Sequence, residues 1–328
     1  MPDIAAEYRI IQTGAGWADR SGRGRLRFEG RDVVGFLQGL LSNDVATIGP
    51  GGGVYATWLT PQGRLVADFR IYHRGDALVA DVVPGLAADL AGRLDQLIFA
   101  EDVRVADVSS ATALVTVVGA GAADVLSRAF GLDARALATL RPLGQIDAGA
   151  GAFVIRADES EWPMFDVWMP AADSDNVISR LASGGARAIS ADLLEVLRIE
   201  AGRPAFGIDM TTETIPLEAG LLDRAISTTK GCYVGQEVII RVLHRGHGRV
   251  ARKLVGLAFE GGSAPASGMA VEAGGREVGR ITSSALSAAL ERPIALAYLH
   301  RDFVEPGTKV SAGGHPGVVT ALPFVRQV

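Results

Sequence analysis

The chain has 328 residues, a formal net charge of −5 and a single cysteine, Cys232. At this length two or three domains are expected, because one hydrophobic core rarely serves so many residues. The acidic balance argues against general nucleic-acid binding, which needs clustered positive charge. One cysteine excludes an intrachain disulfide and a four-cysteine metal or iron–sulfur site within the chain.

No segment has the pattern of an export signal or a membrane span. The first residues, MPDI, are acidic and no basic segment leads into an apolar one. The most apolar stretch, residues 113–123, is too short to cross a bilayer. We therefore expect a cytoplasmic protein without membrane or nucleic-acid partners.

The first hundred residues mix helices with antiparallel strands. A strand is expected over 25–29, then a helix over 32–41 with Asp32 as its N-cap. Turns of hairpin length and composition separate the next three strands, which are 54–59, 64–73 and 77–83. Leucines at helical spacing predict a second helix near 86–97.

Strands and helices continue to alternate as far as Gly202. The expected strands are 103–108, 112–118, 152–157 and 164–169, and the expected helices are 120–130 and 174–183. Ser190 then caps a helix that ends at Gly202. Because hairpins accompany the helices, an α+β fold is favoured over a doubly wound α/β fold.

From about residue 253 the sequence consists of short β-like runs separated by Gly, Pro and Ser. This pattern predicts a small antiparallel barrel or sandwich. We therefore expect an N-terminal region of two α+β subdomains over residues 1–248 and a β-barrel domain over 249–328.

Two motifs favour a structural interpretation over a functional one. Residues 119–124 (GAGAAD) follow an apolar strand, as a dinucleotide fingerprint would, but Asp124 replaces the third glycine and would repel a pyrophosphate. His244 and His247 form an H-x-x-H pattern, but glycines around them argue against a regular helix and no third ligand is near. No metal site is expected.

Several polar residues need partners of their own. For Asp68 and Asp81, on predicted strands, a solvated carboxylate is the plainer interpretation of either one alone. Glu200 lies late in a helix, where negative charge is unfavourable, so a specific partner such as a pterin ring is expected. Cys232 is either a small buried hydrophobe or a functional thiol, and the nearby Lys230 and arginines favour its thiolate form.

Residues 230–237 (KGCYVGQE) resemble the K-G-C-Y-x-G-Q-E signature of YgfZ-type proteins. Those proteins are folate-binding relatives of the glycine-cleavage T-protein that support iron–sulfur cluster maturation. Further segments resemble the family, and with the signature they extend through most of the chain: 36–45, 55–68, 198–202 and 215–219. The first resembles both branches, and the hairpin at 55–68 is most similar to the mitochondrial iron–sulfur assembly branch.

The resemblance implies a ring of two α+β parts around a folate channel, a C-terminal β-barrel and tetrahydrofolate as cofactor. It implies Cys232 and Asp68 as catalytic residues. Glu200 would bind the pterin, and the other residues that would bind folate or border the channel are Tyr55, Asn43, Asp81 and Lys230.

We expect from this resemblance a protein that assists the maturation or repair of 4Fe–4S proteins, with Cys232 as functional thiol and iron–sulfur client or assembly proteins as partners. One alternative is a folate-dependent aminomethyltransferase of the T-protein type, and another is a folate-binding scaffold without chemistry. Ala67 stands where the transferases carry the first of two aspartates, and the T-protein lacks the signature cysteine. Both departures favour the maturation role.

Overall fold

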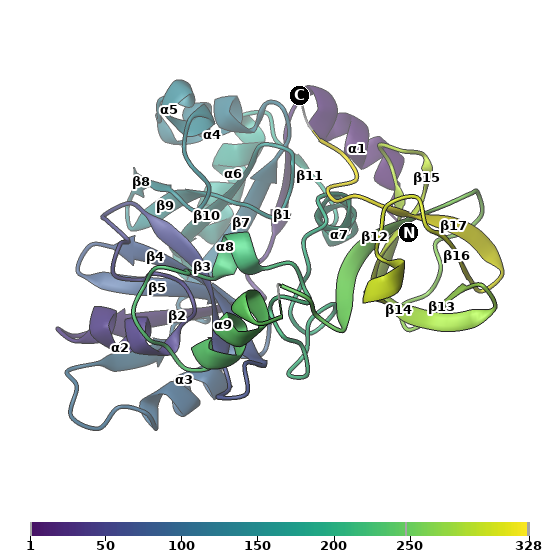
Figure 1. Cartoon of the computed structure of the whole chain (residues 1–328). Coiled ribbons are helices and arrows are strands. Elements are labelled where there is room, and N and C mark those ends of the chain that lie inside the picture. The colour runs from purple at the N-terminus through teal and green to yellow at the C-terminus, as the bar shows by residue number, and fades with distance from the viewer. Residues whose placement is uncertain (1, 247, 327–328) are drawn as a thin grey trace.

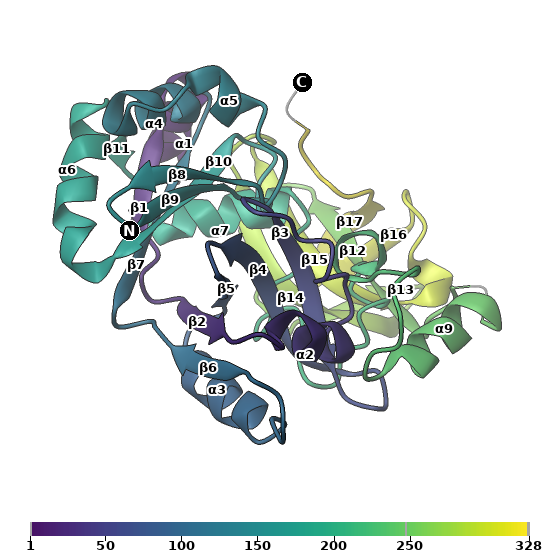
Figure 2. The same cartoon turned by 90° about the vertical axis from the view of Figure 1, so that its left-hand side faces the viewer.

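The computed structural model describes residues 2–246 and 248–326, and three β-sheets organise them (Figure 1). Two sheets carry the helices of the N-terminal part, and the third closes into a barrel on the other side of the molecule (Figures 1 and 2). The predicted fold class, α+β with a C-terminal antiparallel β-barrel, is confirmed.

The first sheet has five antiparallel strands in the order β3-β4-β5-β2-β6. They are β2 (Gly24–Glu29), β3 (Gly53–Leu59), β4 (Leu65–Arg74), β5 (Ala77–Val82) and β6 (Arg104–Asp107). Helices α2 (Val33–Leu40) and α3 (Ala87–Asp95) pack on one face in a shared apolar core. Because side chains alternate along a strand, β4 places Ala67 and Phe69 in this core and Asp68 and Arg70 on the opposite face.

The second sheet has six strands in the order β11-β1-β7-β10-β9-β8. They are β1 (Gly16–Asp19), β7 (Thr112–Val118), β8 (Gln145–Gly149), β9 (Ala152–Arg156), β10 (Met164–Pro170) and β11 (Arg187–Ala188). Its outer face is covered by α4 (Ala122–Phe130), α5 (Ala134–Ala138) and α6 (Ser174–Ser183). Tyr72 of the first sheet meets Trp168 of the second edge to face, so one core joins both sheets.

Helices α1 (Ile4–Thr13) and α7 (Ala191–Glu200) pack together through Tyr8, Leu193 and their neighbours. As predicted, Ser190 caps α7, and its Oγ accepts a hydrogen bond from the Leu193 N–H at 3.2 Å. In Figure 1, α7 lies between the N-terminal sheets and the barrel. The end of α7 is therefore placed to connect the two parts.

The barrel closes in the order β12-β15-β14-β13-β16-β17. Its strands are β12 (Arg252–Phe259), β13 (Ala270–Ala273), β14 (Arg276–Ser287), β15 (Arg292–His300), β16 (Lys309–Ala312) and β17 (His315–Thr320). Short helices α8 (Leu222–Ala225) and α9 (Gln236–His244) precede it. The division of the chain after residue 248 stays a prediction.

One local prediction is wrong. Asp32 precedes α2 but does not cap it, because its carboxylate accepts a hydrogen bond from the Asp102 N–H at 2.7 Å instead. The prediction that no regular helix runs through both His244 and His247 is tested only as far as Gly246, and α9 ends at His244, before that glycine. His247 lies outside the described residues.

Within residues 2–246 and 248–326, no helix has both the length and the apolar character needed to cross a bilayer.

Candidate functional site

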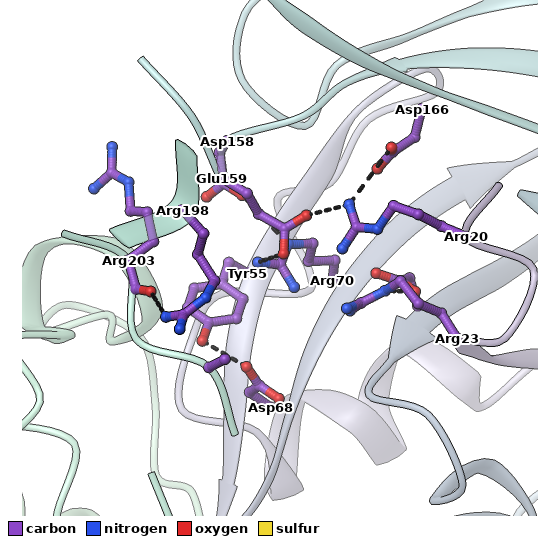
Figure 3. A network of polar contacts seen from close by, with 12 residues as sticks. Arg20, Arg23, Tyr55, Asp68, Arg70, Asp158, Glu159, Asp166, Arg198 and Arg203 are labelled. Carbon is purple, nitrogen blue, oxygen red and sulfur yellow. Dashed lines mark hydrogen bonds and ion pairs between the residues drawn. The ribbon is translucent and has the colours of Figure 1, made fainter. Parts of the chain in front are cut away.

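A buried polar network lies on the face of the first sheet that is turned away from α2 and α3 (Figure 3). Arg70 on β4 contacts Asp158 at 3.3 Å and Glu159 at 3.1 Å, so it reaches from the first sheet to the loop after β9. Arg20 contacts the same Glu159 at 2.6 Å and Asp166 at 3.7 Å. Interleaved opposite charges make burial of these groups possible.

Electrostatics keep the central carboxylate of this network ionised. Burial alone would raise the pKa of Glu159, but the charges of Arg20, Arg70 and Arg23 outweigh it and hold that pKa well below its usual range. Arg224 pairs with Asp158 from the other side. These acids therefore serve as fixed counter-ions for the arginines.

Asp81, predicted to border the folate channel, belongs to the same network. Its carboxylate contacts Nε of Arg23 at 2.6 Å, and its side chain is buried. The structure therefore shows Asp81 as an ion-pair partner, and a direct contact of Asp81 with folate stays a prediction.

Asp68 and Tyr55 form a buried hydrogen-bonded pair. The Tyr55 hydroxyl donates a hydrogen bond to Oδ2 of Asp68 at 2.7 Å, and the two residues are only 3% and 5% exposed. Burial first, and then the charge of Asp68, raise the pKa of Tyr55 well above its usual value, so the phenol keeps its proton and donates. The guanidinium carbons of Arg70 and Arg224 lie 5.0 and 5.2 Å from the Tyr55 ring centroid.

Asp68 has no cationic partner of its own. Among the described residues, no arginine, lysine or histidine lies within 4.0 Å of its carboxylate, and Oδ1 accepts no hydrogen bond. Its neighbours Asp81, Asp158 and Glu159 each contact an arginine. A buried carboxylate without a cation is costly, so Asp68 is suited to receive a cationic or proton-donating group of a ligand.

Asn43 and Lys230 hold the backbone behind Tyr55. Nδ2 of Asn43 donates to the Tyr55 carbonyl at 2.9 Å and to the Arg224 carbonyl at 3.2 Å. The Lys230 ammonium donates to three backbone carbonyls at 2.6, 2.7 and 3.0 Å, those of Gln38, Leu41 and Asn43. Burial lowers the pKa of Lys230 to about 8. The structure thus brings together four of the predicted site residues.

Glu200 lies at the end of α7 and contacts the end of β14 and the residues that follow it. Its Oε1 accepts hydrogen bonds from the Ser287 hydroxyl at 2.6 Å and from the Ala289 N–H at 3.3 Å. Burial raises the pKa of Glu200 above its usual value. Its binding of a pterin stays a prediction, and among the described residues no hydrogen bond joins it to Asp68 or Tyr55.

Cys232 is exposed in the loop between α8 and α9. The part of the chain that the structure describes contains no group of three His, Cys, Asp or Glu side chains arranged to hold a metal ion. The predicted catalytic role of Cys232 stays a prediction.

Sequence reasoning missed the arginines and two of their counter-ions, Asp158 and Glu159. Arg70 could have been found, because it follows Asp68 by two residues on the same strand face. Asp158 and Glu159 could not, because they contact Arg70 and Arg20 across 88 and 139 residues of sequence. No local pattern carries that information.

A cavity of about 430 Å³ lies at the end of α7, between Arg224 and the first residues of the barrel. Arg203 and Arg224 line it, and Nε of Arg203 is buried without a hydrogen-bond partner. Two arginine side chains at one cavity favour an anionic ligand. The carboxylate tail of a folate is such a group, and these residues therefore fit the predicted cofactor.

Two domain models match the chain, and together they define the class of proteins to which its architecture belongs. The GCVT N-terminal domain matches residues 1–230, and the glycine cleavage T-protein C-terminal barrel domain matches residues 252–325. A solved structure of the glycine cleavage system aminomethyltransferase T from Bartonella henselae superposes with a TM-score of 0.88 at 23% identity, covering 99% of this chain and 90% of that one. That likeness supports the fold.

Curated relatives extend the match to the sequence. The chain is 32% identical over 327 residues to an aminomethyltransferase of Rubrobacter xylanophilus, covering 99% of the chain and 87% of the relative. It is also 32% identical over 342 residues to one of Geobacillus kaustophilus, covering 99% and 91%. The chain belongs to the glycine cleavage T-protein family, whose aminomethyltransferases use tetrahydrofolate. The family and cofactor predictions are confirmed at this level.

The main functional prediction is wrong. The relatives that match 98–99% of the chain are aminomethyltransferases, and these comparisons support neither the YgfZ branch nor iron–sulfur partners. That prediction depended on eight residues, most of which form the loop that leads into α9. The matches that overturn it extend over both the α+β part and the barrel.

Proposed function

We propose that this protein is a folate-dependent aminomethyltransferase. It transfers the carbon of an aminomethyl group from a carrier protein to two nitrogen atoms of tetrahydrofolate. The carrier–carbon and carbon–amine bonds break, and the two protons lost by the folate nitrogens leave on the carrier atom and on the ammonia. The observation that carries the proposal is Asp68, a buried carboxylate that is hydrogen-bonded to Tyr55 and has no cationic partner among the described residues. An amine substrate supplies the missing cation.

Asp68 acts on the amine of the substrate. Its Oδ2 is held by the Tyr55 hydroxyl, so Oδ1 is the oxygen that orients the amine and accepts its proton. Arg70 and Arg224 flank the Tyr55 ring and keep the phenol in place. Since the surrounding acids are ion-paired with arginines, the amine meets one available carboxylate rather than several.

The departure at Ala67 is compatible with transfer. Ala67 is 1% exposed and packs in the apolar core with α2, on the face of β4 opposite to Asp68. A carboxylate at that position would point away from Tyr55. The second position of the pair, occupied here by Asp68, is the one that faces the site.

Folate binding by this chain draws on two regions. Glu200 is the proposed partner of the pterin N–H groups, because burial disfavours its ionised form and two N–H donors would stabilise that form. Arg203 is the proposed partner of the carboxylate tail. Tetrahydrofolate, when bound, supplies the nitrogen atoms that accept the one-carbon unit.

The proposal is tested with the full chain, tetrahydrofolate and an aminomethylated carrier protein. We expect methylene-tetrahydrofolate and ammonia to form in equal amounts and with multiple turnovers. Folate binding without product would replace the proposal with the scaffold alternative. Absence of folate binding would overturn it altogether.

A further inference from the structure

Arg70 is a cation that lies within reach of Asp68. The two residues are separated by one position on β4 and lie on the same face of the first sheet. Because a strand rises about 3.3 Å per residue, their Cα atoms are about 7 Å apart, a span that an arginine side chain can cross. The Arg70 guanidinium lies 5.0 Å from the centroid of the Tyr55 ring, whose hydroxyl bonds Asp68. Since an arginine is always charged, Arg70 is a potential competitor of a substrate amine for Asp68.

Two acids bind the Arg70 guanidinium in place of Asp68. Nη2 contacts Glu159 at 3.1 Å and Nε contacts Asp158 at 3.3 Å, and both acids belong to the loop after β9 (Figure 3). The side chains of Arg70, Asp158 and Glu159 are only 9–12% exposed, so solvent screens these contacts weakly. Among the described residues, no cationic nitrogen lies within 4.0 Å of the Asp68 carboxylate.

Glu159 is itself fixed from its other side. Its Oε1 faces Arg70, and its Oε2 contacts Arg20, from the loop after β1, at 2.6 Å. Without the charge of Glu159, Nη2 of Arg70 would belong to a buried cation with one counter-ion fewer, which is costly. Asp68 is the neighbouring carboxylate that still lacks a cation, so a pair between Arg70 and Asp68 would satisfy both groups.

We propose that Glu159, together with Asp158, is a positioning residue that keeps Arg70 off Asp68 and so leaves this carboxylate open to the amine of the substrate. The inference rests on the proposed function. With Arg70 held by the two acids, the amine meets Asp68 without first displacing a cation of the protein. If Arg70 were paired with Asp68, only the fraction of molecules with an open carboxylate would bind the amine, and the apparent affinity would fall by that fraction.

The test measures transfer by the full chain with saturating tetrahydrofolate and increasing concentrations of an aminomethylated carrier protein. In Glu159→Gln we expect KM for the carrier to rise about ten-fold, with kcat within about three-fold of the natural value, because the amine must displace Arg70. A merely structural role of Glu159 would lower the fraction of active enzyme, and therefore kcat, without raising KM. That outcome would overturn the inference.

Asp147→Asn is the matched control. Asp147 contacts Arg74, another arginine of β4, at 3.2 Å, and the Arg74 guanidinium lies 4.7 Å from the Phe153 ring centroid. This pair also joins the two sheets beside an aromatic ring, but it has no contact with Asp68 or Tyr55 among the described residues. Both KM and kcat should stay at their natural values in Asp147→Asn.

Adding Arg70→Met to Glu159→Gln removes the competing cation, while Arg224 still flanks the Tyr55 ring. KM for the carrier should return to within about three-fold of the natural value. A KM that stays about ten-fold raised in the double variant would overturn the inference. The double variant also decides the matter if Glu159→Gln does not fold, because it loses both charges of the buried pair together.

The failure of this inference is distinguishable from that of the proposed function. If the natural chain forms no methylene-tetrahydrofolate, the proposed function fails. If the natural chain transfers and Glu159→Gln leaves KM for the carrier unchanged, only the positioning role of Glu159 is overturned.

Discussion

The buried carboxylates of the site differ in the groups that they contact. Asp158 and Glu159 meet arginines at 3.3 and 3.1 Å, whereas Asp68 meets the neutral hydroxyl of Tyr55. An ion-paired acid is satisfied in the free protein, but an acid bonded to a phenol still lacks a cation. This difference between neighbours, rather than burial itself, assigns the chemistry to Asp68.

Glu200 allows a test of whether a residue that binds tetrahydrofolate also lowers the free energy of unfolding. Burial raises its pKa, so the folded protein binds this proton more tightly than the unfolded chain does. The contribution of Glu200 to the free energy of unfolding is therefore greatest below about pH 4.5 and falls as the pH rises through the raised pKa.

We expect Glu200→Gln to remove the fall in the free energy of unfolding with rising pH, because the neutral amide oxygen can still accept a hydrogen bond from Ser287. Calorimetry at pH 7 should show an unfolding midpoint higher by about 2 °C. Titration should show tetrahydrofolate affinity about ten-fold weaker, since a charge-assisted contact is lost. Unchanged affinity would remove Glu200 from the folate site.

At the scale of elements, Lys230 closes the end of α2. The last carbonyls of a helix lack partners within it, and the Lys230 ammonium bonds those of Gln38 and Leu41 as well as that of Asn43. Asn43 in turn bonds the Tyr55 carbonyl. The segment before α9 thereby fixes the backbone that carries Tyr55.

Lys230→Met should leave three carbonyls without their donor. We expect a loss of about 2–4 kcal/mol in the free energy of unfolding, measured by urea denaturation. Lys309→Met is the control, because Lys309 is exposed on β16 and should change stability by less than about 0.5 kcal/mol. Equal effects of the two substitutions on the free energy of unfolding would contradict the role of Lys230 in stabilising the end of α2.

The elements themselves were largely predictable. Strong turn residues at 61–63 predict the β3–β4 hairpin, and its register places Tyr55 opposite Arg70. Helix α1 was missed, and α9 was obscured by the glycines that follow it. The contacts of Lys230 could not be predicted, because its carbonyl partners lie 187–192 residues away in the sequence.

At the scale of the molecule, Arg198 joins α7 to the barrel. Its guanidinium contacts Asp209 at 2.7 Å and the Ser283 hydroxyl of β14 at 2.8 Å. Ser283 donates to the same Asp209 at 2.6 Å, so helix, loop and barrel share one buried cluster. Relative placement of the two parts depends on this cluster.

Arg198→Met should cost about 3–5 kcal/mol, because it leaves Asp209 buried without its cation. The double variant with Asp209→Asn should cost less than the sum of the two single changes, as a urea-unfolding cycle would show. Strict additivity would mean that the pair does not act as a unit.

Composition and turn patterns predict the α+β part and the barrel, since each is built from local signals. The function was harder to predict, because the eight-residue K-G-C-Y-x-G-Q-E resemblance indicated a different branch of the family from the one that matches the full chain. Ala67 looked like a missing acid until the pleat of β4 placed it in the apolar core. The side chain of Ala67 points away from the site, and sequence spacing alone did not show this.

The central claim is that Asp68 carries the transfer chemistry, and Asp68→Asn tests it most directly. The variant keeps the shape of the side chain but loses the charge and the basic oxygen. We predict that formation of methylene-tetrahydrofolate from an aminomethylated carrier falls by at least about 100-fold, while tetrahydrofolate affinity changes by less than about three-fold. Transfer at the rate of the natural chain in Asp68→Asn would contradict the account.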